Sequence, residues 1–420
     1  MLFGSSGIRR PYDRTLVELA LHVGYALGGK GESVLLGTDT RTTSGIISAA
    51  VASGLCASGA SVDSGGICPT PSIGFGARTR DAGCMVTASH NPEPDNGLKI
   101  FGPDGSSFSE REQEALELRI AAAMTGEWDS QGEIRTVDPV HPHMTAILER
   151  VKISGCMKAV LDCGNGAGSV MTPDLLMDLG VSVTGINCNP LGRFARPSEP
   201  LEPNLAYMRS LITSSGADCG IAHDGDADRM VGFDPAGRMI TGDALMILFC
   251  RYLGAGRVVT TVDASMAIEK EAEVRRTPVG DSYVSEALRS WGDFGAEPSG
   301  TWIFRRHSLC PDGPYAAALF CEIASEWDLA GELGTIPTYP VLRVSVPCKD
   351  PGARMSAIGA ERPTDGIRLT EENGWCLIRA SGTESKIRFT AEGITAADAK
   401  RMLDAGRDLV RRGKVLKEAG

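Results

Sequence analysis

The sequence predicts an α/β protein of several domains, with a smaller α+β module at its C-terminal end. The chain has 420 residues, which is more than one hydrophobic core accommodates, and chains of this length form about two to four domains. Short apolar segments of strand length alternate with longer amphipathic segments through most of the chain. From residue 341 onward the pattern changes to strands followed by one long helix.

The predicted strands run into polar loops. A strand at 34–37 ends in the polar loop 38–43, and the next helix covers 46–59. Such alternation is typical of mostly parallel sheets covered by helices, in which ligands bind at the carboxyl ends of the strands. Further strands are expected at 84–87, 159–162, 181–186 and 219–222, and part of a helix at 175–179.

Proline-containing stretches divide the chain near 136–143, 235–242 and 335–340. Each stretch interrupts the alternating pattern and is predicted to be a domain boundary. The last boundary begins the α+β module, where strands at 341–346 and 375–379 and a terminal helix at 396–414 are expected.

The glycine-rich stretch 164–168 follows the strand at 159–162. It reads Gly-Asn-Gly-Ala-Gly, which lacks the G-x-G-x-x-G spacing and the later acidic residue of a dinucleotide-binding motif. We therefore interpret it as a tight turn from a strand into a helix.

The composition argues against nucleic acid and membrane partners. The formal net charge is -11, with 42% hydrophobic and 23% charged residues, whereas nucleic acids and anionic membranes require a basic surface. The first residues do not resemble a signal peptide, and no apolar run approaches the roughly 20 residues of a membrane span. The twelve cysteines form no C-x-x-C pair and are typical of buried thiols in a reducing compartment. A cytoplasmic protein is expected.

The first motif with chemical meaning is the loop 87–92, Thr-Ala-Ser-His-Asn-Pro, which continues to Lys99. It follows a strand, and its Pro, Asn, Asp and Gly residues indicate a loop. Ser89 is a candidate phosphoryl carrier, and His90 and Lys99 can supply charge and hydrogen-bond donors around a phosphate. The alternative is an ordinary turn in which the serine caps a helix.

The second motif is the acidic loop 224–229, which follows the strand at 219–222. Asp224, Asp226 and Asp228 alternate along it, so their carboxylates face one side of an extended segment and repel one another unless a cation neutralises them. Oxygen ligands favour Mg²⁺ or Ca²⁺ over zinc. A phosphoserine is a natural fourth ligand and would connect this loop to Ser89. The alternative is a solvated acidic turn.

Two further loops have weaker signals. The first covers 379–386, and Arg388 lies just beyond it. Arg379 can bind phosphate oxygens in a bidentate manner, and the Ser-Gly-Thr turn can offer N–H groups to an anion. In 295–301, Glu297 and Ser299 are two residues apart on an extended segment and face the same side. That pair suits hydrogen bonds to neighbouring sugar hydroxyls, whereas the loop at 379–386 could also be a hairpin turn with exposed charges.

These four loops, in this order, resemble the α-D-phosphohexomutase family along essentially the whole chain. The opening residues 3–9, Phe-Gly-Ser-Ser-Gly-Ile-Arg, are close to the family's F-G-T-S-G-I-R, and residues 37–41 are close to G-R-D-T-R. The resemblance implies four domains around a central cleft, three of them α/β with mixed, mostly parallel sheets and the last α+β. The domains would span 1–138, 139–235, 236–338 and 339–420, and each would contribute one loop.

The resemblance also implies a role for each loop. Ser89 would be phosphorylated, and Asp224, Asp226 and Asp228 would hold Mg²⁺ together with the phosphoserine. Arg229 would lie beside them, and Arg9 and Lys99 match positions associated with proton transfer and charge stabilisation. Glu297 and Ser299 would select the sugar. The non-reacting phosphate would be held by Arg379, Ser381, Gly382 and Thr383, with Arg388 nearby.

The implied reaction is a phosphosugar isomerisation. Phosphoserine 89 would transfer its phosphoryl group to a sugar monophosphate, and the other phosphate of the bisphosphorylated intermediate would return to Ser89, with hexose 1,6-bisphosphate as the activator. The sequence departs from many relatives at Thr301, where they have the histidine used as a general acid or base. Ala380 and Ser385 also replace two family prolines, but neither change removes a phosphate donor.

The loop at 295–301, called the sugar loop below, lies downstream of residues 277–281. Together these two segments are most similar to the phosphoglucosamine branch of the family, especially its archaeal-type members. Glucosamine phosphate is therefore the expected substrate, and glucose or mannose phosphate is the alternative. A phosphatase that releases inorganic phosphate, and a sensor without catalysis, are the rival functions. A sensor would be expected to have lost Ser89 or one of the three aspartates, and all four are present.

Overall fold

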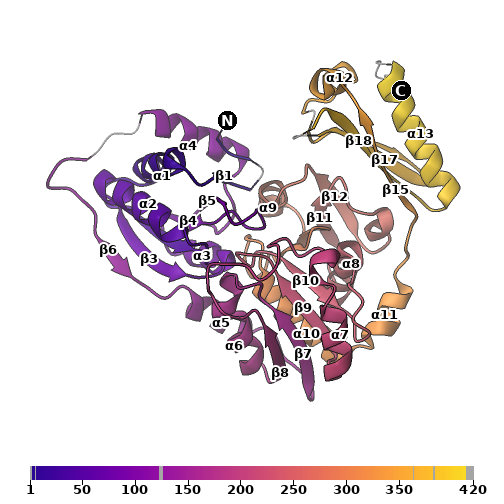
Figure 1. Ribbon diagram of the computed structural model, residues 1–420, viewed down its shortest axis with the longest axis horizontal. Coiled ribbons are helices and arrows are strands. Elements are labelled where there is room, and N and C mark those ends of the chain that lie inside the picture. Colours follow the sequence, from indigo (N-terminus) through magenta and orange to yellow (C-terminus); the bar gives the residue numbers. More distant parts are fainter. Residues whose placement is uncertain (1, 5, 123–125, 363, 382–383, 413–420) are drawn as a thin grey trace.

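The computed structural model describes residues 2–4, 6–122, 126–362, 364–381 and 384–412. Four sheets follow one another along the chain, and helices accompany each of them. Figure 1 shows the first sheet and its helices at one end of the molecule, the second and third in the middle, and the fourth next to the C-terminus. Each sheet takes its strands from one of the four predicted segments, while the boundaries between the segments stay predictions.

The first sheet confirms the predicted strands at 34–37 and 84–87 and the helix at 46–59, with ends that differ by one or two residues. Its strands are β1 (Ile8–Pro11), β2 (Ser33–Thr38), β3 (Ser61–Ile67), β4 (Ala82–Val86), β5 (Asp95–Phe101) and β6 (Ile134–Thr136), and its helices are α1 (Arg14–Leu27), α2 (Ser44–Ser58), α3 (Thr70–Ala77) and α4 (Glu110–Ala122). The strand order is β1-β5-β4-β2-β3-β6, and the central strands are parallel. A Cβ on Gly24 would lie 2.3 Å from the carbonyl oxygen of Val51, so glycine allows α1 and α2 to touch.

The second sheet has the order β10-β9-β7-β8, with only β10 antiparallel. It comprises β7 (Met157–Asp162), β8 (Val181–Ile186), β9 (Cys219–His223) and β10 (Met230–Phe233), with helices α5 (Val140–Leu148), α6 (Thr172–Asp178) and α7 (Met208–Ser215) and short 3-10 turns at Ala167–Val170 and Glu202–Leu205. The glycine-rich stretch is the tight turn that was predicted. Gly164 and Asn165 both have positive φ, +55° and +58°, before the chain enters the 3-10 turn. The helix α6 ends at Asp178, one residue before the predicted end.

The third sheet has the order β12-β11-β13-β14, with only β14 antiparallel. It comprises β11 (Arg257–Thr261), β12 (Glu273–Thr277), β13 (Phe294–Glu297) and β14 (Thr301–Ile303), with helices α8 (Gly242–Leu253), α9 (Asp281–Ser290), α10 (Gly313–Glu326) and α11 (Leu329–Thr335) and a 3-10 turn at Met266–Lys270. Although α10 follows the third sheet in sequence, it packs against β9 and β10 of the second. Phe320 of α10 and Leu161 of β7 belong to the same buried cluster, so the middle two sheets share one core.

The C-terminal module is the predicted α+β unit. Its strands are β15 (Val341–Pro347), β16 (Ile367–Glu371), β17 (Gly374–Ala380) and β18 (Lys386–Gly393), and its helices are α12 (Pro351–Ala357) and α13 (Ala396–Arg412). The order is β15-β18-β17-β16 and every neighbouring pair is antiparallel. The last two residues of the predicted terminal helix, 413 and 414, lie outside the described residues.

Two expectations from composition can be compared with the structure. Within the described ranges, no helix has the length and apolar character needed to cross a membrane. All twelve cysteines are free, and eight are buried as predicted. Cys56 was expected to be buried but is only half-buried, and Cys156 is exposed, so burial does not extend to every thiol.

Candidate active site

Ser89 lies in the loop between β4 and β5, and its backbone is held in an uncommon conformation. Its φ is +49°, which is the left-handed region that few residues other than glycine adopt, and such strain clusters at functional sites. Its N–H donates to Thr87 Oγ1 at 2.8 Å. Its carbonyl accepts from Ser198 Oγ at 3.1 Å. The hydroxyl group is therefore presented from a fixed turn.

Arg41 ties this loop together from inside. It is 4% exposed and pairs with Asp39, with 3.0 Å between Nε and Oδ2. Its guanidinium also donates to four backbone carbonyls of the loop, at 2.7–2.9 Å: those of Ser89, Asn91, Pro92 and Asp95. In the sequence analysis Arg41 appears only as the last residue of the stretch 37–41, because the carbonyls it binds are about fifty residues away along the chain.

The serine loop and the acidic loop meet. Ser89 Oγ donates to Asp224 Oδ2 at 2.8 Å and lies 3.3 Å from His90 Nδ1. Ser89 and Asp224 are 135 positions apart along the chain, so the predicted connection between the serine loop and the acidic loop is present in the fold. Ser89 is 1% exposed, which keeps bulk water away from its hydroxyl group in this conformation.

The acidic loop forms a buried cluster of oxygens. Asp224, Asp226 and Asp228 are at most 5% exposed, and each offers a carboxylate oxygen within 4.8 Å of the others. Oδ1 of Asp226 and Oδ1 of Asp228 are buried without a hydrogen-bond partner among the described residues. Buried acceptors normally have partners. Buried carboxylate oxygens this close to one another are hard ligands of the kind that Mg²⁺ prefers, so these residues fit the predicted metal.

Lys99 partly neutralises this cluster. Its Nζ lies 2.7 Å from Asp226 Oδ2 and also contacts Asp228 Oδ2. Burial opposes the charged ammonium, but attraction to Asp226 and Asp228 outweighs it and raises the pKa of Lys99 above its usual value. Lys99 therefore remains protonated and supplies positive charge at the site.

One ammonium group does not satisfy three carboxylates. Burial, followed by repulsion from Asp228 and Asp226, raises the pKa of Asp224 well above its usual value. Burial and Asp226 likewise raise the pKa of Asp228. For Asp226, burial acts in the same direction, but Lys99 reverses the effect and lowers the pKa. Burial and mutual repulsion thus disfavour the ionised forms of Asp224 and Asp228, and a divalent cation held by the three carboxylates would offset both effects.

His90 differs from the prediction that it supplies charge. Burial, reinforced by repulsion from Arg229, Arg9 and Lys99, lowers the pKa of His90 to about 2. Its imidazole is therefore neutral at physiological pH around the unphosphorylated serine. His90 can donate or accept one hydrogen bond beside Ser89, but it carries no positive charge there.

Two arginines complete the charged surroundings of Ser89. Arg9 Nη1 donates to Asn91 Oδ1 at 3.3 Å, and its Nε is buried without a partner among the described residues. The backbone N–H of Arg229 donates to Asp224 Oδ1 at 3.2 Å. Burial disfavours the charge of Arg229, but Asp224 and other carboxylates raise its pKa. The Arg229 guanidinium therefore stays charged, as binding of an anion requires.

The sugar loop places its two predicted residues together. Glu297 ends β13 and is 5% exposed. Its Oε1 accepts from the Gly280 N–H at 3.1 Å, and its Oε2 accepts from Ser299 Oγ at 3.2 Å. Thr301 Oγ1 lies 3.4 Å from Ser299 Oγ. This arrangement confirms that the side chains of Glu297 and Ser299 face the same side, and the Thr301 hydroxyl lies beside them.

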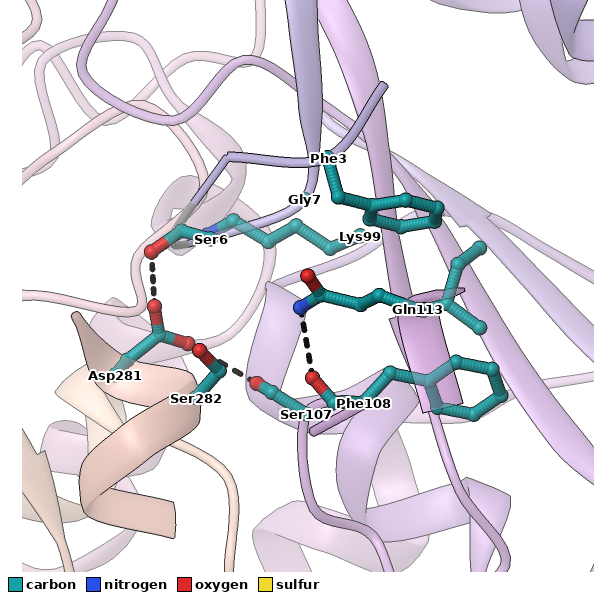
Figure 2. A pocket seen from close by; sticks show the side chains of 10 residues that line it. Phe3, Ser6, Gly7, Lys99, Ser107, Phe108, Gln113, Asp281 and Ser282 are labelled. Atoms are coloured by element: carbon teal, nitrogen blue, oxygen red, sulfur yellow. Dashed lines mark hydrogen bonds between the residues drawn. The ribbon is translucent and has the colours of Figure 1, made fainter. Parts of the chain in front are cut away.

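Asp281 connects the segment next to Glu297 to the N-terminal part of the chain (Figure 2). It begins α9 directly after Gly280, and its carboxylate accepts from Ser6 Oγ and, at 3.0 Å, from Ser107 Oγ. It also raises the pKa of Glu297: burial is the larger cause and repulsion from Asp281 the second, and together they bring it to about 8. The sequence contains no signal for this connection, because Ser6 and Asp281 are 275 positions apart.

We expect Asp281→Asn to weaken this connection. The amide has one acceptor oxygen where the carboxylate has two, so one of the two serine hydroxyls can only accept from the amide N–H. Both contacts also lose the carboxylate charge, and the free energy of unfolding should fall by about 1–2 kcal/mol. Thermal unfolding measures the effect. Ser6→Ala and Ser107→Ala are the matched controls, because each removes one hydroxyl and leaves the charge. An Asp281→Asn variant as stable as the wild type would contradict a role for this contact.

The loop at 379–386, called the phosphate loop below, makes no described bond to the serine loop, the acidic loop or the sugar loop. Arg388 Nη2 donates to Glu384 Oε2 at 3.2 Å, and the N–H of Ser381 donates to the carbonyl of Lys386 at 2.9 Å. Ser381 Oγ is buried without a partner among the described residues. No hydrogen bond or ion pair within those ranges joins Arg379, Ser381 or Arg388 to the other three loops. The predicted Gly382 and Thr383 lie outside the described residues.

Comparison with protein families covers almost the whole chain. Residues 1–127, 141–237 and 241–333 match the alpha/beta/alpha domains I, II and III of phosphoglucomutase/phosphomannomutase, respectively. Residues 341–409 match the C-terminal domain of the same family.

Individual relatives have similar lengths. The chain is 41% identical over 431 residues to the "Probable phosphoglucosamine mutase" of Methanocella arvoryzae, covering 98% of both chains. It is 39% identical over 443 residues to the "Phosphoglucosamine mutase" of Methanococcus vannielii, covering 98% of this chain and 99% of that one. Among solved structures, a phosphoglucomutase/phosphomannomutase family protein from Burkholderia thailandensis superposes with a TM-score of 0.85 at 24% identity, covering 98% of this chain and 97% of that one.

Proposed function

The chain belongs to the phosphoglucomutase/phosphomannomutase family of isomerases, and we propose that it interconverts glucosamine 6-phosphate and glucosamine 1-phosphate through phosphoserine 89. The observation that carries this proposal is the contact between Ser89 Oγ and the buried cluster of Asp224, Asp226 and Asp228. A phosphoryl group on Ser89 would sit beside that cluster, with Lys99, Arg9 and Arg229 as the positive groups around it.

The proposed reaction exchanges one phosphate ester for another. A sugar hydroxyl forms a new bond to the phosphorus of phosphoserine 89, the bond from phosphorus to Ser89 Oγ breaks, and the hydroxyl proton ends on Ser89 Oγ. The sugar now carries two phosphates. It turns over, and its other phosphate returns to Ser89, which leaves the isomeric monophosphate. Hexose 1,6-bisphosphate would act as the activator because it can phosphorylate a resting Ser89.

The charged groups are proposed to stabilise this transfer. A phosphoryl transition state spreads negative charge over three oxygens, and fixed positive groups stabilise it most strongly where water is excluded. The pKa values of Lys99 and Arg229 are raised, so both groups are already charged before the transfer begins. Mg²⁺ held by Asp224, Asp226, Asp228 and the phosphoserine would supply further charge to those oxygens.

The sugar is proposed to bind between the Glu297 loop and the phosphate loop. Glu297 and Ser299 offer acceptors for sugar hydroxyls or for an ammonium group, whereas Arg379, Ser381, Gly382, Thr383 and Arg388 would hold the non-reacting phosphate. Because the phosphate loop has no described bond to the other three, the proposal requires the C-terminal module to approach them when substrate binds.

Glucosamine is favoured over glucose and mannose by two observations. Relatives named phosphoglucosamine mutase are 39–41% identical over nearly the whole chain, and Glu297 offers a carboxylate that an amino sugar could neutralise. We also propose that the enzyme works in the cytoplasm on small phosphosugars, with no nucleic acid or membrane partner.

The test is a panel of three substrates. Purified protein with Mg²⁺ and a trace of hexose 1,6-bisphosphate is given the 6-phosphates of glucosamine, glucose and mannose, and each 1-phosphate is measured. We expect glucosamine 1-phosphate to form fastest. Faster turnover of glucose or mannose phosphate would contradict the proposed substrate and agree with the proposed mechanism. Release of inorganic phosphate without isomerisation would indicate a phosphatase. No reaction on any sugar would contradict the proposal itself.

A further inference from the structure

Two cysteines lie in contact behind the acidic loop. Cys163 directly follows β7, and Cys188 lies two residues beyond β8, the parallel strand next to it. The N–H of Cys163 donates to the carbonyl of Ile186 at 3.2 Å, which extends the pairing of the strands beyond their ends. The two sulfur atoms are 3.5 Å apart. A disulfide has a sulfur–sulfur distance of about 2.05 Å, so a small movement would join them.

The pair combines access with reactivity. Cys163 is buried and Cys188 is only half-buried, so a small reagent can reach Cys188 first. The contact with the Cys163 side chain lowers the pKa of Cys188 against the opposing effect of burial. A thiolate is the reactive form of cysteine. Cys219 and Cys321 also interact with each other, but both are buried, which makes them an internal control.

Hydrogen bonds connect this pair to the acidic loop. Asn187, between Ile186 and Cys188, has a φ of +51° and donates from Nδ2 to Asp162 Oδ1 at 3.2 Å. Asp162 pairs with Arg196 at 2.9 Å. Arg196 Nη2 in turn donates to the carbonyl of His223 at 2.6 Å, and His223 directly precedes Asp224.

The turn after Cys163 makes a second, shorter connection. The N–H of Ala167 donates to the carbonyl of Gly225 at 2.8 Å. A Cβ on Gly166 would lie 2.5 Å from the same carbonyl oxygen, so the turn and the acidic loop are in van der Waals contact. A displacement of the turn is therefore transmitted to the backbone between Asp224 and Asp226.

We propose that Cys163 and Cys188 form a reversible oxidation site for hydroperoxides, and that their disulfide lowers the activity of the enzyme by displacing the acidic loop. In the first step the Cys188 sulfur attacks a peroxide oxygen, the O–O bond breaks, and the departing oxygen leaves as water or an alcohol, which gives a sulfenic acid. In the second step the Cys163 sulfur attacks the Cys188 sulfur, the S–O bond breaks, and water leaves with the Cys163 proton. The two thiols lose two electrons and the peroxide gains them.

The experiment treats the reduced full-length protein with hydrogen peroxide at increasing ratios and follows three quantities. Differential alkylation with mass spectrometry identifies which thiols are lost, isomerase activity is measured with Mg²⁺, and dithiothreitol is then added. We expect a mass decrease of about two hydrogens located at Cys163 and Cys188, a several-fold loss of activity, and recovery of both on reduction. Cys219 and Cys321 should stay reduced.

Two variants separate this pair from general oxidation. Cys188→Ser is a near-isosteric change at a half-buried position and should keep its activity in peroxide, whereas Cys156→Ser at the exposed thiol should respond like the wild type. The proposal is overturned if Cys163 and Cys188 remain free to alkylate while activity falls. It is also overturned if their disulfide forms and activity does not change. Disulfide formation is read by mass, so this result does not depend on which sugar the enzyme uses.

Discussion

Replacing Ser89 with alanine should lower isomerase activity by a factor of about 10³ or more, because the covalent route is lost when the nucleophile is removed. The change deletes one buried oxygen and its hydrogen bond to Asp224. The fold should tolerate it, since the loop is held by Arg41 through backbone carbonyls and not through the Ser89 side chain. Activity and thermal unfolding together measure the two effects.

Phosphorylation can be measured separately from turnover. Wild-type protein incubated with hexose 1,6-bisphosphate labelled in its phosphates should take up about one phosphoryl group, and Ser89→Ala should take up none. Ser198→Ala is the matched control, because Ser198 Oγ donates to the Ser89 carbonyl at 3.1 Å and its loss leaves the Ser89 hydroxyl in place. Equal labelling of Ser89→Ala and wild type would place the phosphoryl carrier elsewhere.

Local sequence patterns predict most of the strands and helices, and they predict which loops carry the candidate site residues. Strands such as β8 and β9 are short apolar runs next to loops, so their positions follow from alternation alone. The meeting of Ser89 with the acidic loop was expected from the family resemblance, which places one loop of each domain at a central cleft. Strand alternation alone does not show it, because β4 and β9 belong to different sheets. The packing of α10 on the second sheet was not predictable, since nothing in a local pattern states which of two apolar sheets a helix covers.

Long-range contacts and burial account for the remaining differences. Arg41 and Asp281 gain their roles from partners far along the chain, which a motif does not display. The neutral state of His90 results from its burial among three positive groups, and composition gives no measure of that environment. The separation of the phosphate loop depends on how the C-terminal module is placed against the others, and that placement is not encoded in the loop.

Glu297→Gln should make the protein more stable at alkaline pH and have little effect at acid pH. Burial first, and then repulsion from Asp281, raise the pKa of Glu297 from 4.5 to about 8. A carboxyl group with a raised pKa in the folded state favours folding when protonated. The wild type therefore loses stability as the pH rises from about 4.5, where the unfolded chain ionises, to about 8, where the folded carboxyl ionises. Above that range the loss is complete.

Glutamine reproduces the protonated side chain. Its oxygen can accept from the Gly280 N–H and its amide can donate to Ser299 Oγ, so both contacts of Glu297 persist without charge. The pKa difference corresponds to a free energy of up to about 5 kcal/mol. Glu297→Gln should be more stable than the wild type by a substantial part of that amount at pH 9 and should match it at pH 4. Thermal unfolding across this pH range measures the difference.

The exposed Glu372 supplies the control, since Glu372→Gln changes the same chemical group where burial is absent and should leave the unfolding curve unchanged at every pH. Parallel pH curves for the wild type and Glu297→Gln would contradict the raised pKa. If the variant is more stable and also less active on glucosamine 6-phosphate, then the buried carboxyl group destabilises the fold in the absence of substrate. Such a group is retained at a binding site because a ligand with compensating charge, here an ammonium group, restores the lost free energy on binding.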